Sequence, residues 1–273
     1  MYHNSHVPKK SLGQHFLTSK GAVIKIIEAA ALISTDTILE IGPGTGVLTS
    51  ALIEAVNEAG RVVAVEKDEL LARELRITFA ASIAHKKLHL ITGDILTTPP
   101  ATLGLQRGSY KLVANIPYYI TGEIIRTFFE TSEQPSSMTL LVQKEVADRI
   151  VARDGKESIL SISVKAYGTP HYIHTVKAGS FNPPPKVDSA ILHISTISKN
   201  FFKTFSEEHF FTIVRGGFAH KRKLLSSNLR EIFPTLELSR LQDIFSTCGI
   251  DAKSRAEDVT LAQWHSLAKN LLP

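Results

Sequence analysis

The residues with the clearest chemical content stand together as Asn115-Ile116-Pro117-Tyr118, directly after an apolar run. An aromatic amine is a poor nucleophile because its lone pair is delocalised, so a site that methylates it must accept hydrogen bonds from its N–H groups. The amide oxygen of Asn115 can accept one, and the carbonyl of Ile116 can accept the other, because Pro117 holds the residue before it extended. Tyr118 offers an aromatic face on which a base can stack. Such a site needs alignment with a methyl donor rather than a general base. For the isolated tetrapeptide, a proline turn beside a core tyrosine is the alternative.

A glycine loop, Gly42-Pro43-Gly44-Thr45-Gly46, follows a second apolar run and precedes a helical pattern. Glycines in that position let a ligand approach the backbone closely. Glu66 follows Gly42 by 24 residues, at the end of the next apolar run, where a carboxylate can accept the hydroxyls of a ribose. Asp94 ends a further run and can accept a hydrogen bond from the amine of an adenine. Together these residues predict a cofactor that contains a nucleoside.

The glycine spacing narrows the choice of cofactor. In the dinucleotide fingerprint the third glycine falls one residue later than Gly46 does, and the phosphate-binding P-loop pattern is absent from the sequence. A short loop after an acidic residue, Glu40, suits S-adenosylmethionine, which is cationic and has no pyrophosphate. A nicotinamide-dependent oxidoreductase is therefore disfavoured. An ordinary glycine turn, with Glu66 on a solvated strand end, remains the alternative.

The elements that must position these residues alternate along the first half of the chain. Apolar runs predict strands at 37–41, 61–65, 88–91, 111–114 and 138–142, and helical patterns separate most of them, at 47–56, 68–79 and 124–129. Alternating strands and helices indicate a mainly parallel sheet covered on both faces. Two further strands, at 171–176 and 190–195, are expected to form an antiparallel hairpin at the sheet edge. Between them, Phe181 precedes three prolines and is a candidate to stack on the other face of the target base.

From the pattern of elements we expect three regions. Residues 1–20 form an N-terminal segment, residues 21–198 form the α/β domain, and residues 199–273 form a small all-α domain after a linker at 196–206. Helical patterns at 207–214, 223–232, 238–245 and 261–272 fill the last region, and Thr260 with Gln263 forms a capping box for the final helix.

The charge and composition restrict the classes of protein. The chain has 273 residues, of which 43% are hydrophobic and 21% charged, with no apolar stretch long enough to span a membrane and no secretory signal. One cysteine allows no internal disulfide, we expect no metal site, and a cytoplasmic location fits best. The net charge is +5, and the excess lies in residues 1–20 and 199–273 around a nearly neutral middle. Basic ends favour a polyanionic partner, with a general solubility bias as the alternative.

Taken together, these motifs resemble those of the ribosomal RNA adenine dimethyltransferases, and within that family the small-subunit enzymes. The resemblance extends over about residues 9–271 and is carried by Lys10–Leu17, Glu40–Gly46, Glu66, Gly93-Asp94, Asn115–Tyr118, Leu141–Glu145, Phe181–Ala190 and Arg255–Glu257. Two residues depart from the commonest family pattern: His15 stands where Asn is frequent, and Ile116 where Leu is frequent.

The resemblance implies a Rossmann-like class I methyltransferase fold with a mainly parallel seven-stranded sheet, and S-adenosylmethionine as cofactor. Gln14, His15 and Leu17 would belong to a lid over the cofactor, and Gly42 would contact its methionine part. Glu66 would contact the ribose and Asp94 the adenine. Asn115 and Tyr118 would hold the target amine and base. The expected cofactor contacts are completed by Glu40, Gly44, Gly46, Lys67, Ile95 and Asn115.

The resemblance also implies a substrate: the N6 atoms of two adjacent adenosines in the 3′-terminal hairpin loop of 16S rRNA, within an assembling small subunit. The helical C-terminal domain would help to bind RNA, with Arg215, Lys221, Arg222, Lys223 and Arg230 facing phosphates along helices and with Lys9, Lys10 and Lys20 flanking the lid. A monomer without membrane contact is expected. The alternatives are a large-subunit (23S) rRNA adenine dimethyltransferase that confers macrolide resistance, and a non-catalytic ribosome-assembly factor.

Overall fold

The computed structural model describes residues 13–57 and 59–271 of the chain. The larger part of the expected lid segment, including Lys9 and Lys10, therefore lies outside the described residues. The chain separates into two compact units. The first consists of Met1–Ala147 with His171–Ile197, and the second of Asp148–Pro170 with Ser198–Pro273.

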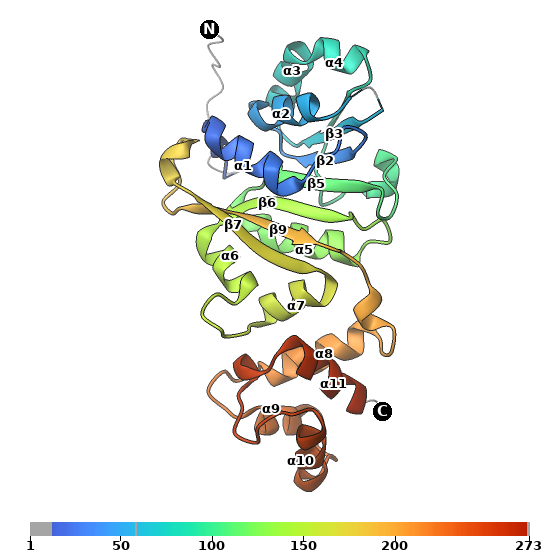
Figure 1. The fold of residues 1–273 in the computed structure, drawn as a ribbon, viewed down its shortest axis with the longest axis vertical. Helices are drawn as coiled ribbons and strands as arrows, with labels where there is room; N and C mark the ends of the chain where they lie inside the picture. Colours follow the sequence, from blue (N-terminus) through green and yellow to red (C-terminus); the bar gives the residue numbers. More distant parts are fainter. Residues whose placement is uncertain (1–12, 58, 272–273) are drawn as a thin grey trace. The chain divides into compact units, whose positions relative to one another are not determined.

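A seven-stranded sheet forms the centre of the first unit (Figure 1). Its strands, in spatial order, are β4 (Leu88–Thr92), β3 (Arg61–Glu66), β2 (Thr37–Ile41), β5 (Tyr110–Asn115), β6 (Ser137–Gln143), β9 (Ser189–Ser195) and β7 (Thr169–Val176). The pairings from β4 to β6 are all parallel, and β9 runs antiparallel to β6. The predicted class and the predicted edge hairpin are thus confirmed. Because β2, β3 and β5 are parallel neighbours, their carboxyl ends meet at one edge of the sheet.

Helices connect these strands and cover the sheet. They are α1 (Lys20–Ala30), α2 (Val47–Ala55), α3 (Glu69–Thr78), α4 (Ala80–Ala84), α5 (Thr121–Glu130) and α6 (Lys144–Val151), with short 3-10 helices η2 (Pro100–Leu103), η3 (Tyr118–Ile120) and η4 (Ala178–Ser180). Ser19 caps α1 by accepting from the backbone of Ala22, and Asp68 caps α3 by accepting from Leu70. Apolar residues of α1 and α2 share one buried cluster with residues of the sheet, so these two helices cover the same face.

A second, two-stranded sheet joins distant parts of the chain. Strand β1 (Phe16–Leu17) pairs antiparallel with β8 (Phe181–Asn182), placing Phe16 opposite Asn182 and Leu17 opposite Phe181. The backbone N–H of Thr18 extends the contact by donating to the carbonyl of Ser180 at 2.8 Å. Residues 16–18 are therefore anchored beside the loop that carries the prolines.

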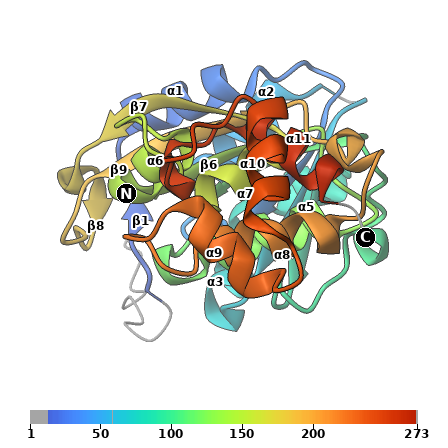
Figure 2. The same ribbon diagram turned by 90° about the horizontal axis from the view of Figure 1, so that it is seen from below.

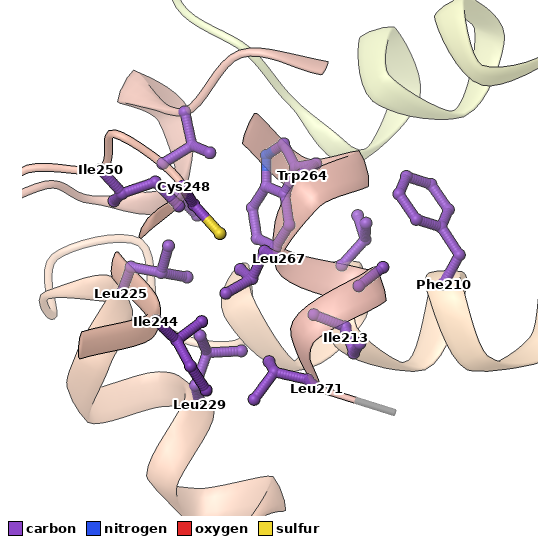
Figure 3. Packing of buried hydrophobic residues seen from close by; sticks show 14 of the residues in the cluster. Phe210, Ile213, Leu225, Leu229, Ile244, Cys248, Ile250, Trp264, Leu267 and Leu271 are labelled. Carbon is purple, nitrogen blue, oxygen red and sulfur yellow. The ribbon is translucent and has the colours of Figure 1, made fainter. Parts of the chain in front are cut away.

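The second unit is helical. It contains α7 (Ile159–Tyr167), η5 (Asn200–Phe202), α8 (Glu207–Gly217), α9 (Leu225–Ile232), α10 (Leu238–Thr247), η6 (Ala256–Asp258) and α11 (Leu261–Asn270), and Figure 2 shows α8 to α11 gathered together. The predicted capping box of Thr260 and Gln263 is present at the start of α11. Figure 3 shows that Trp264, Phe210, Leu229 and their neighbours point toward one another from different helices.

The compact units differ from the expected regions in one segment. Residues 148–170, expected in the α/β domain, group with the C-terminal helices. The reason is packing: Ile162 and Ala166 of α7 lie in the same apolar cluster as Phe205, Phe210 and Trp264. The expected linker at 196–206 likewise contains η5, and Phe205 is buried. None of the helices within the described ranges is long and apolar enough to cross a membrane.

Candidate active site

The sheet edge formed by the carboxyl ends of β2, β3 and β5 opens into a cavity of about 340 Å³. The expected residues that line it are Gln14, His15, Leu17, Glu40, Gly42, Gly44, Glu66, Lys67, Asp94, Ile95, Asn115, Ile116, Pro117 and Tyr118. Residues from five separate stretches of sequence are thereby brought to one place by the strand order.

The glycine loop after β2 forms one wall of the cavity. Gly42 and Gly44 have positive φ angles of 64° and 59°, which L side chains rarely adopt. A Cβ atom on Gly42 would meet no atom within 4 Å, whereas one on Gly44 would lie 3.0 Å from the ring of Phe16. The loop therefore leaves open space at Gly42 for a ligand and is closed at Gly44 by the N-terminal segment.

Glu66 ends β3 and is tied to the same loop. One of its carboxylate oxygens accepts a hydrogen bond from the backbone N–H of Gly44 at 3.0 Å, and the other accepts from Asp68 at 2.8 Å. Burial raises the pKa of Glu66, while these backbone donors oppose the shift. Each oxygen retains a further lone pair, so the carboxylate is held in place and can still accept from a ligand.

Glu40, the last acidic residue before the loop, is only 1% exposed, and its Oε2 atom has no hydrogen-bond partner among the described residues. Burial raises its pKa to about 8, and the negative charge of Glu66 adds to the shift. An unpartnered buried carboxyl is costly unless a ligand satisfies it, and a cationic ligand would do so best.

On the opposite side of Glu66, Asp94 and Lys67 form an ion pair across the cavity rim. Their Oδ2 and Nζ atoms are 2.7 Å apart, and Asp94 also accepts from the backbone of Leu96 at 3.0 Å. The hydrogen bond from Lys67 holds the pKa of Asp94 below its usual range. Asp94 is therefore ionised at neutral pH and available as an acceptor.

Asn115 and Ile116, at the end of β5, present two acceptors side by side. The amide nitrogen of Asn115 donates to the carbonyl of His15 at 3.2 Å, which fixes the direction of its amide oxygen. Neither that oxygen nor the carbonyl of Ile116 makes a hydrogen bond to any residue that the structure describes. The phenol of Tyr118 is held 2.6 Å from the hydroxyl of Ser189, so the ring has a fixed orientation beside both acceptors.

The N-terminal segment is fastened over this end of the cavity. His15 Nδ1 lies 2.7 Å from the carbonyl oxygen of Pro183, and its ring stacks on Tyr118 with centroids 6.1 Å apart. The amide of Gln14 donates to the carboxylate of Asp68 at 3.3 Å. His15 thus keeps a polar contact, although Asn is frequent at this position in the family.

The comparison with protein families agrees with this geometry. A family model described as "Ribosomal RNA adenine dimethylase" matches residues 5–272. The chain belongs to the ribosomal RNA adenine dimethylase family. Like the family, it is an S-adenosylmethionine-dependent enzyme that methylates ribosomal RNA.

Individual relatives support the assignment. The chain is 42% identical to "Ribosomal RNA small subunit methyltransferase A" of Dehalococcoides mccartyi, over 95% of this chain and 87% of the relative. A crystal structure of a dimethyladenosine transferase from Plasmodium falciparum matches with a TM-score of 0.78 and 25% identity, covering 93% of this chain and 96% of that one. The crystal structure of the 23S rRNA methyltransferase ErmE matches with a TM-score of 0.77 and 24% identity, covering 94% and 99% of the two chains, and shows the shared fold.

The cavity of this family member fits S-adenosylmethionine in its donor set. The unpartnered Oε2 of Glu40 suits a cationic group, and the open space at Gly42 admits a ligand against the backbone. Glu66 and Asp94 retain acceptor capacity for ribose hydroxyls and an adenine amine. Within the described residues, no group of histidine, cysteine and acidic side chains could hold a metal ion.

Two expected site residues of the dimethylase are not brought to the cavity. Gly46 has a φ of 82°, and a Cβ atom there would lie 2.6 Å from the ring of Phe79, so this glycine allows α2 to pack against that ring. Phe181 is only 4% exposed, belongs to the apolar cluster of the sheet, and lines neither this cavity nor its neighbour. The expected stacking of Phe181 on a base is therefore corrected: its side chain is a core residue opposite Leu17.

Three residues that were not expected from the sequence take part in the site. Asp68 accepts from Gln14 and from the start of α3, Ser189 holds Tyr118, and Tyr119 lines the cavity while remaining 64% exposed. Asp68 and Tyr119 lie within two residues of expected site residues, so proximity to a strand end was an available signal. No sequence signal pointed to Ser189, because its contact with Tyr118 depends on the antiparallel placement of β9.

Proposed function

We propose that this enzyme dimethylates the N6 atoms of two adjacent adenosines in the 3′-terminal hairpin loop of 16S rRNA during assembly of the small subunit. The observation that carries the proposal is the pair of unpartnered acceptors at Asn115 and Ile116 beside the ring of Tyr118. The 42% identical relative is named for the small subunit, which favours this substrate over large-subunit RNA.

The residues perform the reaction by positioning. Asn115 Oδ1 and the Ile116 carbonyl accept the two N–H groups of the target amine, which draws its lone pair out of conjugation and directs it into the cavity. Tyr118 stacks on the base, a contact typically worth about 1–3 kcal/mol. When bound, S-adenosylmethionine supplies an electrophilic methyl group. After transfer the amine loses a proton, and the fixed alignment supplies most of the rate.

Transfer of labelled methyl groups to defined acceptors tests the substrate. Unmethylated small subunits, large subunits and duplex DNA are each incubated with labelled cofactor, and the nucleosides are analysed. Dimethyladenosine in the small-subunit RNA alone is expected. Label in large-subunit RNA would favour the resistance enzyme instead. Absence of label everywhere, with cofactor binding intact, would favour the assembly factor.

The second unit is proposed to contact RNA. Of its expected basic residues, Lys221, Arg222 and Lys223 lie in the loop between α8 and α9 rather than along helices, which corrects the expected placement. Lys223 is paired with Glu231 at 2.7 Å, so the remaining cations are the stronger candidates for phosphate contact. RNA affinity should fall with rising salt concentration, and it should fall less steeply in a variant lacking Lys221 and Arg222.

The setting of the reaction follows from the substrate. We place the enzyme in the cytoplasm, on a pre-ribosomal particle, acting as a monomer of 30.0 kDa. Light scattering of the free protein and cosedimentation with immature small subunits test these assignments.

A further inference from the structure

A second cavity of about 1100 Å³ adjoins the cofactor cavity in the first unit. Its lining combines the N-terminal segment 13–18 with the proline loop 182–187, and Tyr118 lines both cavities. The target base is proposed to stack on Tyr118, so the second cavity lies directly beside the place of methylation.

The two cavities differ in chemistry. The lining of the cofactor cavity includes four carboxylates, those of Glu40, Glu66, Asp94 and Glu123, which suit a cationic ligand. The second cavity has no carboxylate among its described lining residues, and it carries Lys186, for which the described chain supplies no ion pair. A ligand with a negative charge, such as a nucleotide, is therefore favoured there over another cation.

The remaining lining suits the face of a base. Pro183, Pro184 and Pro185 present saturated rings, and Val187 and Val47 are 46% and 38% exposed although both are apolar. Apolar side chains that remain accessible inside a cavity indicate a ligand surface, because they gain free energy when a flat, weakly polar group covers them.

One polar side chain in this cavity is able to recognise a base. Gln143 is the last residue of β6, and its amide has no hydrogen-bond partner among residues 13–57 and 59–271. It lies opposite Ser189 in the β6–β9 register, and Ser189 holds the phenol of Tyr118. Gln143 also belongs to the segment Leu141–Glu145, which has had no function in the site described so far.

We propose that the second cavity binds the nucleotide adjacent to the target adenosine and that Gln143 recognises its base as an adenine. This inference rests on the proposed function, because it requires a substrate with two neighbouring adenosines. A glutamine amide can accept from the N6 amine of adenine and donate to its N7, an arrangement that other bases do not match. Lys186 is then available to a phosphate of the same nucleotide, and the proline loop covers the face of its base.

The same contact distinguishes the states of the neighbour. An unmethylated or monomethylated adenine still has an N6–H to donate, and a dimethylated adenine has none. The cavity therefore holds an unfinished neighbour more tightly than a finished one. This difference favours retention of the RNA for as long as the neighbouring adenosine is unfinished.

The test couples the protein residue to the neighbouring base. Gln143→Leu removes the hydrogen bonds at similar volume, and Gln106→Leu is the matched control, because Gln106 is exposed just before β5, at the opposite edge of the sheet. Wild type and both variants are assayed on small-subunit particles whose hairpin carries either adenosine or uridine beside the target adenosine. Initial transfer to the target is measured, together with cofactor affinity by calorimetry, which shows whether each variant is folded.

With adenosine as neighbour, Gln143→Leu is expected to lower transfer about ten-fold, the typical value of a bidentate amide–adenine contact. With uridine as neighbour, wild type and Gln143→Leu should be equal, and Gln106→Leu should match wild type on both particles. An equal penalty on both particles, or no penalty on either, overturns the inference while leaving the proposed function intact. Failure of the wild type to dimethylate the adenosine particle would instead overturn the proposed function.

Discussion

The two units bury different kinds of side chain. In the first unit the carboxylates of Glu40, Glu66 and Asp68 are all at most 5% exposed. In the second unit, the buried polar residues that the structure describes are neutral, namely Ser161 and Asn228. A buried carboxylate lowers stability unless partners compensate, whereas apolar packing raises it. The buried carboxylates therefore lower the stability of the first unit and serve ligand binding. The second unit is stabilised mainly by apolar packing.

The core of the second unit illustrates the contrast. Phe201 lies 4.9 Å from Phe210 in an edge-to-face arrangement, and Phe205 stacks on Phe210 at 5.8 Å. Such aromatic pairs add roughly 0.5–1.5 kcal/mol each beyond the burial of their area. Variants in the two units should therefore change different measured quantities.

The largest effect is expected at Asn115 in the first unit. Asn115→Ala removes an acceptor for the target amine, and the transfer rate should fall roughly 10²- to 10³-fold. Cofactor affinity and thermal stability should change little, because the amide contacts only the carbonyl of His15 within the described structure. Single-turnover kinetics and calorimetry measure the two quantities. If cofactor affinity fell as far as the rate, Asn115 would not be a substrate contact.

The next effect concerns pH. The pKa of Glu40 is raised from 4.5 to about 8, so the folded protein binds a proton that the unfolded chain releases. The resulting stability is present at low pH and is lost as pH rises toward 8, by about 3 kcal/mol between roughly pH 5 and pH 8. Glu40→Gln should remove that part of the decline and leave the part due to Glu66. Denaturant titrations across this range provide the measurement, and an unchanged slope in the variant would contradict the assignment.

Glu66→Ala should weaken cofactor binding by roughly ten- to a hundred-fold, the usual loss for hydrogen bonds to a charged group. The backbone donors of Gly44 and Asp68 also lose their acceptor, so part of the loss comes from a less ordered loop. The rate at saturating cofactor should fall less than the affinity does. Titration calorimetry decides the matter, and an affinity equal to that of the wild type would exclude the ribose contact.

The smallest effect is expected at Gly217 in the second unit, where a substitution should change stability and leave cofactor binding unchanged. A Cβ atom there would lie 2.4 Å from the indole of Trp264, so Gly217→Ala should lower the free energy of unfolding by about 2 kcal/mol. Gly122→Ala is the control, since a Cβ atom at that helical position meets nothing within 4 Å. Scanning calorimetry measures stability, and cofactor affinity should be unaffected. A loss of cofactor affinity in Gly217→Ala would contradict the separation of stability and ligand binding between the two units.

Much of the fold and the position of the cavity were predictable from the sequence. Apolar periodicity located the strands and most helices, and the glycine spacing with Glu66 and Asp94 located the cavity, because these signals are local. The pairing of Phe16–Leu17 with Phe181–Asn182 was not predictable, since two-residue strands that are distant in sequence leave no periodic pattern.

Contacts between residues that are distant in sequence also explain why some site and domain predictions were wrong. Phe181 has the residue type expected of a stacking platform, and only the register with Leu17 turns it into the core. Residues Ile159–Tyr167 form a helix whose apolar face joins the core of the second unit, and a helical sequence pattern does not specify which core such a face joins. Gly46 belongs to the same glycine loop as Gly42 and Gly44, but it lies against the ring of Phe79 and does not line the cavity. The spacing of the glycines does not reveal this contact, because Phe79 is distant in the sequence.

The single tryptophan gives the second unit an optical signal of its own. Trp264 is fully buried, and its ring stacks on Phe218 with centroids 5.7 Å apart, entirely within the helical unit. Indole emission moves to longer wavelength when water reaches the ring. The emission of this side chain under selective excitation therefore reports the opening of the second unit alone. The first unit has no tryptophan and does not contribute to the signal.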